Sequence, residues 1–242
     1  MATRTDADIT FTGPPTNLKA IVRFTAPDQK VLPVTLKIGG EPAVFRSYIK
    51  PFGNDRSEIR LRLPRETAAG IYNGAATVDG KPMPVVVRID AVFRLRVQPP
   101  KTLLSADAGA RADFSLTIMN VGNVPFEVPK TAQFDLDDAE GQDRALGRAL
   151  RATLPAGEKR VDRFFEEVRA AHGGEARLNV RAGSGTVPPG ASADVTALLE
   201  VPAIAQAGRS YRGAWPLGNT SHVIEVQVKK GGTTPNGGRT PA

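Results

Sequence analysis

The chain contains no cysteine, and this absence removes a whole group of functions at once. Disulfide bridges, iron–sulfur clusters, thiolate zinc sites and cysteine nucleophiles all need that side chain. Histidine is almost absent too: His172 and His222 are the only two in 242 residues, which excludes a histidine-rich metal site. No Gly-x-Ser-x-Gly, phosphate-loop or dinucleotide-binding fingerprint is present. We expect no cofactor, no metal and no catalytic residue.

Long apolar runs are missing as well. No stretch approaches the roughly 18 apolar residues that a membrane-spanning helix needs, and residues 1–6 lack the apolar core of a secretory signal. The sequence as given predicts no membrane span. We expect a periplasmic or extracellular location if a leader has been removed, and a cytoplasmic location otherwise.

Aromatic residues make up only 6% of the chain, although hydrophobic residues in total make up 40%. The core must therefore rest mainly on Val, Ile, Leu and Ala. Glycine (24) and proline (20) are numerous and scattered, which is typical of many short strands joined by turns. A length of 242 residues leaves room for two domains, each with its own core.

One short pattern occurs twice in the chain. Residues 70–75 read Gly-Ile-Tyr-Asn-Gly-Ala, and residues 208–214 read Gly-Arg-Ser-Tyr-Arg-Gly-Ala. An alternating run rich in Val follows each copy, and such alternation is the period of a half-buried strand. We interpret the two copies as the last hairpins of two related β-sandwich domains.

About seven alternating runs fill residues 1–90, with turn residues between them. The clearest run is residues 57–63, which places Ile59, Leu61 and Leu63 on one face and charged residues on the other. This spacing is typical of an immunoglobulin-like sandwich. We therefore predict an all-β protein of two tandem immunoglobulin-like β-sandwiches, at residues 1–90 and 91–230, with a flexible tail at 231–242.

The strand period is lost between about residues 138 and 173. Four apolar residues there have the spacing of one helix face: Val161, Phe164, Phe165 and Val168. Gly173-Gly174 is a suitable helix stop, and Ala149 with Leu150 indicates a shorter helical turn before it. We predict a helical insertion within the second sandwich, at about 138–173.

Turn chemistry in the second half carries a resemblance. Residues 115–123 read Ser-Leu-Thr-Ile-Met-Asn-Val-Gly-Asn, and residues 187–196 read Val-Pro-Pro-Gly-Ala-Ser-Ala-Asp-Val-Thr, ahead of the second copy of the repeated pattern. These segments resemble bacterial immunoglobulin-like domains appended to glycosidases and surface proteins, including the α-galactosidase-associated type. The resemblance covers about residues 91–138 and 176–229. It implies a spacer, adhesion or assembly module that is usually exported and usually not catalytic.

The repeated pattern supplies four residues with a structural interpretation. Tyr72 and Tyr211 are interpreted as tyrosine-corner-like elements whose hydroxyls bond to backbone near the preceding turn, with ligand stacking as the alternative. Gly74 and Gly213 would then be small because a ring or a neighbouring strand packs over them.

Acidic residues gather at Asp135, Asp137, Asp138, Glu140 and Asp143. Calcium prefers several carboxylates on one loop, but this spacing does not match an EF-hand, and a hairpin turn is the simpler interpretation. Whether the run binds calcium stays open.

Glu166 and Glu167, with Asp162 and His172, would suit an acid–base set. In the helix register, however, both glutamates fall off the apolar face, so we expect them to be solvated.

The net charge of +7 is not concentrated in one block of sequence. Seven basic residues occur within the insertion, but acidic residues are interleaved with them and no aromatic platform for bases is apparent. We interpret the charge as an Arg-rich surface and do not expect nucleic-acid binding.

We predict a non-catalytic structural or protein-binding subunit that acts through sandwich edges and the helical insertion, on another protein or on a second copy. Candidate partner contacts are Phe164, Phe165, Val168 and Trp215. The alternative is a carbohydrate- or surface-binding accessory module of an exported bacterial system. That alternative needs an exposed aromatic platform, for which the single tryptophan, Trp215, is the candidate; a core position is the other interpretation of Trp215.

Overall fold

The computed structural model describes residues 9–23, 30–51, 56–78, 81–155, 157 and 159–230, so the predicted tail lies outside the described residues. The prediction of an all-β chain with a small helical insertion is confirmed. The chain forms two compact units. One comprises Met1–Arg96, Met119–Phe126 and Thr186–Ser192, and the other comprises Val97–Ile118, Glu127–Gly185 and Ala193–Ala242. Because both units are discontinuous in sequence, the boundary expected after residue 90 stays a prediction.

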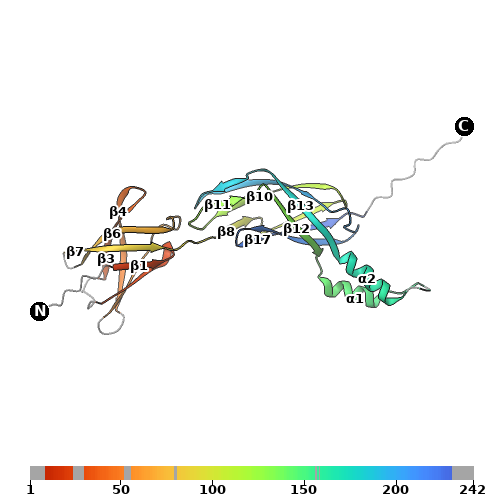
Figure 1. Ribbon diagram of the computed structural model, residues 1–242, viewed down its shortest axis with the longest axis horizontal. Helices are drawn as coiled ribbons and strands as arrows, with labels where there is room; N and C mark the ends of the chain where they lie inside the picture. The colour runs from red at the N-terminus through yellow and green to blue at the C-terminus, as the bar shows by residue number, and fades with distance from the viewer. Residues whose placement is uncertain are drawn as a thin grey trace. The chain divides into compact units, whose positions relative to one another are not determined.

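The first seven strands form what we call the N-terminal barrel (Figure 1). In chain order they are β1 (Ile9–Gly13), β2 (Leu18–Val22), β3 (Val31–Ile38), β4 (Glu41–Pro51), β5 (Ser57–Leu61), β6 (Gly70–Val78) and β7 (Lys81–Ile89). Their spatial order is β1-β2-β5-β4-β3-β6-β7, and β1 pairs in parallel with β7 to close the barrel. Lettered A to G, this is the A-B-E-D and C-F-G arrangement of an immunoglobulin-like sandwich whose two sheets are joined.

The predicted alternation produces the core of this barrel. Inward positions are fully buried while the residues between them face solvent, as antiparallel sheets allow. The buried side chains are mostly aliphatic: Ile9, Phe11, Leu18, Leu32, Val34, Leu36, Ile59, Leu61, Val85 and Val87. The low aromatic content therefore does not prevent a continuous core.

The remaining strands form the C-terminal sandwich. They are β8 (Leu95–Gln98), β9 (Lys101–Ala106), β10 (Arg111–Asn120), β11 (Phe126–Val128), β12 (Thr131–Asp138), β13 (His172–Ala182), β14 (Gly185–Val187), β15 (Ser192–Glu200), β16 (Ser210–Leu217) and β17 (Thr220–Val228). The main sheet runs β8-β10-β15-β13-β12-β16-β17-β9, and β11 pairs separately with β14. The A-B-E-D-C-F-G order of the barrel therefore recurs, with β8 and β9 sharing the role of the first strand.

Strand pairing corrects one expectation about function. We predicted that open sandwich edges would receive a partner, but every strand of the N-terminal barrel has two neighbours, so that prediction is wrong for the barrel. In the C-terminal sandwich, the ends of the main sheet are β8 and β9, which are both short. In the barrel, by contrast, the pairing of β1 with β7 leaves no free edge.

The repeated pattern lies on equivalent strands, because β6 and β16 each hold the sixth position in the shared order. The Tyr72 hydroxyl donates a hydrogen bond to the backbone carbonyl of Ala68 at 2.9 Å, four residues upstream. A Cβ on Gly74 would lie 2.1 Å from the Thr35 carbonyl oxygen, and one on Gly213 would lie 2.5 Å from Cδ2 of Phe134. Both glycines therefore sit where a neighbouring strand or ring leaves no room for a side chain.

Replacing Gly74 by Ala should destabilise the N-terminal barrel by about 1 to 3 kcal/mol, because the new methyl group clashes with the backbone of β3, which cannot yield cheaply. Chemical denaturation of the full chain measures the change. Asn73→Ala, at the exposed neighbouring position of the same strand, is the control and should alter the free energy of unfolding by about 0.5 kcal/mol or less. Equal midpoints for the two variants would refute the close-approach argument.

Candidate functional site

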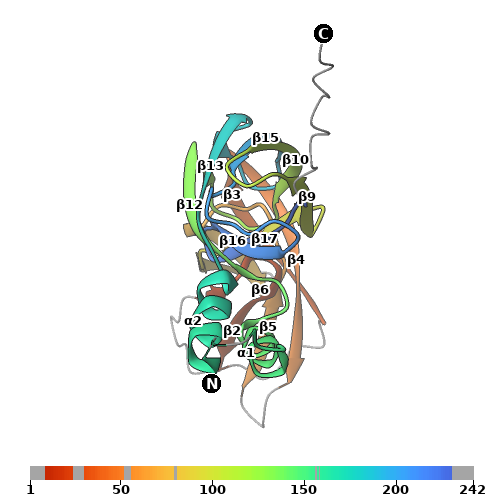
Figure 2. The ribbon, with the colours of Figure 1, turned by 90° about the vertical axis from the view of Figure 1, so that its right-hand side faces the viewer.

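Two helices replace the turn between β12 and β13 of the C-terminal sandwich. They are α1 (Gln142–Arg151) and α2 (Arg160–Ala171), and together we call them the helical hairpin. The antiparallel ladder of β12 and β13 reaches Asp137 opposite His172, and the hairpin begins just beyond it. Figures 1 and 2 show α1 and α2 side by side past the ends of these strands. Among the described residues, no helix combines the length and apolar character needed to cross a bilayer.

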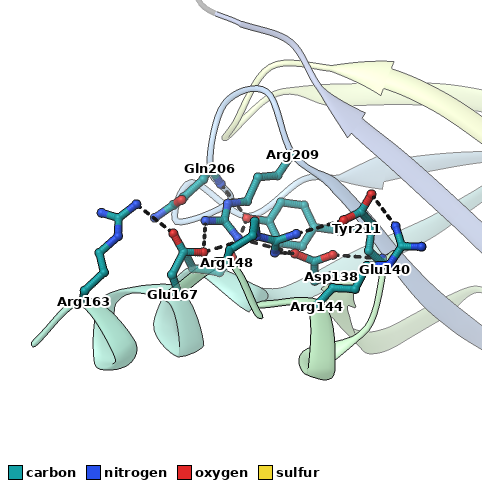
Figure 3. A network of polar contacts seen from close by, with 10 residues as sticks. Asp138, Glu140, Arg144, Arg148, Arg163, Glu167, Gln206, Arg209 and Tyr211 are labelled. Carbon is teal, nitrogen blue, oxygen red and sulfur yellow. Dashed lines mark hydrogen bonds and ion pairs between the residues drawn. The ribbon is translucent and has the colours of Figure 1, made fainter. Parts of the chain in front are cut away.

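The face of α2 turned inward is not the apolar one. Its buried residues are Glu167, Ala170 and Ala171, and the side chain of Glu167 is only 6% exposed. Our expectation that Glu167 would be solvated is therefore wrong. The physical reason is Arg209, which lies in the turn before β16 and meets the glutamate from the sandwich side (Figure 3).

Three arginines surround Glu167. Its Oε2 accepts hydrogen bonds from Arg209 at 2.6 Å and from Arg148 at 3.4 Å, and its Oε1 accepts one from Arg163 at 2.9 Å. Burial opposes ionisation, but the hydrogen bonds and charges of Arg209, Arg148 and Arg163 outweigh it and hold the pKa of Glu167 below its usual 4.5. The carboxylate therefore stays ionised inside the fold.

Asp138, at the end of β12, forms the second acidic centre of this cluster. Its side chain is 4% exposed, and its Oδ2 accepts hydrogen bonds from Arg148 and, at 3.4 Å, from Arg209. Arg148 also donates to Glu140 at 2.9 Å, and Arg144 approaches Glu140 at 3.3 Å. We call Asp138, Glu167, Arg148 and Arg209 the buried charge cluster. It joins both helices, strand β12 and the turn before β16 (Figure 3).

Tyr211 adds a neutral link to the same place. Its hydroxyl accepts a hydrogen bond from the Gln206 amide at 3.1 Å and donates one to the Ala170 carbonyl at 2.9 Å. The first bond is the tyrosine-corner contact with the preceding turn, and the second reaches the last turn of α2. A Cβ on Gly173 would lie 2.6 Å from the Tyr211 ring, so position 173, two residues past the end of α2, must be glycine for this approach.

The acidic run does not gather into a cation site in the part of the chain that is described. No group of three or more His, Asp or Glu residues there is arranged to hold a metal ion. Asp138 and Glu140 are instead paired with Arg148, and a cation would have to displace that guanidinium. Asp137 faces His172 at 3.6 Å on the surface.

The outward face of the helical hairpin is apolar. On α2, the exposed fractions are 51% for Val161, 59% for Phe165 and 44% for Val168, and on α1 Leu150 is 64% exposed. Phe164 is half-buried and meets the Phe165 ring edge-on, with the centroids 5.6 Å apart. We call Val161, Phe165 and Val168, which share one face of α2, the apolar hairpin face. The predicted amphipathic helix therefore exists, but it is turned with its apolar stripe toward solvent.

Trp215 is not available to a partner on the surface. It is completely buried in β16, edge-on to Phe114 with ring centroids 6.5 Å apart, so its proposed roles as a partner contact and as an exposed platform are both wrong. Its cross-strand neighbour His222 is also buried, and the His222 Nε2 lies 2.7 Å from the Thr102 hydroxyl. Both side chains belong to the core of the C-terminal sandwich.

Sequence reasoning missed Arg148 and Arg209 as partners of the acidic groups. One signal was present, because Arg209 lies inside the second copy of the repeated pattern, directly before the tyrosine strand. Nothing in sequence spacing connects Arg209 to Glu167, which lies 42 residues away.

Comparison with known proteins adds little to the geometry. No protein-family model matches the chain, and no curated protein matches it. Among solved structures, a titin fragment is similar at 10% identity over 92% of this chain and 96% of that one, with a TM-score of 0.35. A structure of three titin immunoglobulin domains is similar at 9% identity over 93% of this chain and 63% of that one, with a TM-score of 0.36. A Dpr immunoglobulin domain bound to DIP-gamma is similar at 12% identity over 92% of this chain and 96% of that one, with a TM-score of 0.34.

At these TM-scores the likenesses carry no argument, so the immunoglobulin-like assignment rests on the strand order itself. The narrower resemblance to α-galactosidase-associated bacterial domains stays a prediction.

Glu167→Gln should destabilise the C-terminal sandwich by about 2 to 3 kcal/mol, because it removes the charge that compensates Arg209 inside the fold. Hydrogen exchange should show the largest loss of protection in α1 and α2. Glu166→Gln is a matched control, since the Glu166 side chain is 60% exposed and forms an ion pair with Arg163 of the same helix. Similar losses for both variants would show that the cluster does not hold the hairpin.

Mild acid should also weaken the C-terminal sandwich. Burial lowers the pKa of His222 from its usual 6.5, so the unfolded chain takes up the proton first and stability falls as the pH drops below about 6.5. The slope should be at most about 1.4 kcal/mol per pH unit for one proton. Denaturation between pH 7.5 and 5.5 measures it, above the range in which Glu167 titrates. His222→Gln should flatten the profile, and an unchanged slope would exclude His222 as the cause.

Proposed function

We propose that this chain is a non-catalytic protein-binding module, and that the apolar hairpin face is the surface that meets the partner. The observation that carries the proposal is that α2 buries an ion-paired glutamate and two alanines while its large apolar side chains are exposed. Apolar side chains gathered on one exposed surface are typical of a contact with another protein.

The geometry favours recognition because the hairpin is ordered before any partner arrives. The buried charge cluster and the Tyr211 hydroxyl fix α2 against the turn before β16 and fix α1 against β12. A surface held in its bound form loses less conformational entropy on association. Phe165 is suited to be the anchor, since aromatic side chains at the centre of an interface contribute strongly to affinity.

The charged residues of the site fit a structural role better than an acid–base role. A general acid or base works best with a pKa near the operating pH, whereas Glu167 has its pKa lowered and is bound by three arginines. Arg148 and Arg209 are likewise engaged by carboxylates. These contacts favour a structural role, in which the charged residues hold the hairpin in place.

The carbohydrate-binding alternative loses its main support in this fold. It required an exposed aromatic platform at Trp215, and that ring is completely buried. An exported location and a bacterial accessory role remain predictions from the resemblance alone.

A photo-crosslinking amino acid placed at position 165 should yield a discrete adduct in cells that express the full chain, because this side chain is the most exposed ring of the hairpin. Val168→Ser in the same chain should strongly reduce the adduct, while the free energy of unfolding changes by about 0.5 kcal/mol or less. Light scattering of the purified chain at two salt concentrations then distinguishes self-association from a different partner.

The matched control for the crosslinker is position 103, where Leu103 is 69% exposed on β9 of the same unit. Adducts that form equally from positions 103 and 165, or that persist unchanged with Val168→Ser, would contradict recognition through the apolar hairpin face.

A further inference from the structure

The positive charge of the chain is concentrated in its first 96 residues. They contain 15 Lys and Arg against 9 Asp and Glu, a net charge of +6, whereas residues 97–242 contain 17 against 16. Almost the whole net charge of +7 therefore belongs to the N-terminal part. The apolar hairpin face lies elsewhere in the chain, so any role of this charge is independent of the function proposed above.

Strand pairing gathers several of these cations on one face of the barrel. On adjacent strands, Lys19 of β2 lies opposite Arg60 of β5, and Arg60 lies opposite Tyr48 of β4. Lys50 lies two residues after Tyr48 on β4 and Arg46 two residues before it, so both share its face. All four basic residues are exposed, while the intervening Ala20, Ser47 and Ile59 point into the fold and are buried.

An aromatic ring is part of this cationic face. Tyr48 is 57% exposed, with Arg60 across the strand and Arg46 and Lys50 along it. Neighbouring strands are about 4.8 Å apart, so Arg60 lies one strand spacing from Tyr48 and Lys19 lies two. We call Lys19, Arg46, Tyr48, Lys50 and Arg60 the cationic sheet face.

One carboxylate, Glu58, shares the outward positions of β2, β4 and β5 in the described chain. It forms an ion pair with Arg60 and lies in register with Lys50. The Arg60 hydrogen bond, followed by the charges of Arg60, Lys19 and Lys50, lowers the pKa of Glu58. Glu58 is thus outnumbered by the basic groups around it, Arg60, Lys19 and Lys50.

We infer that the cationic sheet face binds single-stranded nucleic acid, with one base stacked on Tyr48 and the flanking phosphates held by the surrounding Lys and Arg side chains. Proteins that bind single strands without sequence preference combine basic groups that follow the nucleic-acid backbone with an aromatic side chain on which a base stacks. Cations lie on both sides of Tyr48 along its strand and on one side across it, which suits a polymer whose charges flank a planar group. A lipid surface or a sulfated glycan would use the cations but would not need the ring.

This inference reverses our expectation from the sequence that nucleic acid is not a partner. That expectation rested on the lack of an aromatic platform among clustered basic residues. The residues of the cationic sheet face are spread over positions 19 to 60 and become neighbours only through the β2-β5-β4 pairing.

The first test is fluorescence anisotropy of a labelled 12-nucleotide oligo-dT with the full chain at several salt concentrations. We expect saturable binding, with log K falling against log salt at a slope of about −2 to −3 if three or four phosphates are contacted. Tyr48→Ala should weaken binding about 5- to 150-fold with little change in slope, because stacking carries no charge. Tyr48→Phe should bind like the unchanged chain.

Lys50→Gln and Arg46→Gln should each make the salt slope shallower by about 0.7, since each removes one phosphate contact. Lys81→Gln is the matched control, because Lys81 is exposed at the start of β7, outside the part of that strand that pairs with β1. All of these side chains are exposed, and an unchanged thermal unfolding curve verifies that each variant is folded.

Three results would overturn the inference. The first is no saturable binding of oligo-dT at low salt. The second is equal affinity of Tyr48→Ala and the unchanged chain, which would mean that no base stacks on the ring. The third is binding of heparin, or of vesicles containing phosphatidylserine, that is tighter than binding of oligo-dT and insensitive to Tyr48→Ala. Such binding would assign the face to a polyanion without bases.

Discussion

The helical hairpin depends on one electrostatic arrangement, in which two almost fully buried carboxylates are compensated by two partly exposed guanidinium groups. Glu167 and Asp138 are almost fully buried, and each is bound by both Arg148 and Arg209. Removing any one member would leave the buried charges only partly compensated, which costs more than the loss of a surface ion pair. The cluster therefore behaves as a single structural element, to which β12, both helices and the turn before β16 each contribute.

That arrangement explains why the apolar stripe of α2 faces outward. A helix can bury only one face against the sandwich, and here the buried face is the one that carries Glu167, Ala170 and Ala171. Small alanines permit close approach, and the charged groups are satisfied by ion pairs and hydrogen bonds. Val161, Phe165 and Val168 are then left for solvent or for a partner. The buried ion pairs hold α2 in place, and its exposed apolar side chains are thereby presented in a fixed orientation.

Much of the fold could be predicted because it follows from local periodicity. The alternation around Ile59 and Leu61, the turn residues between runs and the Tyr72 and Tyr211 repeat indicated short strands in two related units, and the spacing of residues 161–168 indicated α2. The site was predicted only in part. Phe165 and Val168 were candidate contacts and are exposed, but Glu167 was expected in solvent and Trp215, also a candidate contact, is buried. Those errors share a cause: burial depends on what other segments place opposite a side chain, and the partner of Glu167 comes from a distant turn.

The sequence by itself determined the all-β character, the strand spacing and the helical insertion. Through its lack of cysteine, it also determined which classes of chemistry are excluded. Each of these follows from composition or from the period of neighbouring residues. The tertiary structure alone decided which face of α2 is buried, that the barrel closes without an edge, and that Tyr48 lies among four cations. These features depend on pairing between strands and on compensation of charges between segments far apart in the chain. Such long-range contacts are specified by the whole fold, and no local pattern reveals them.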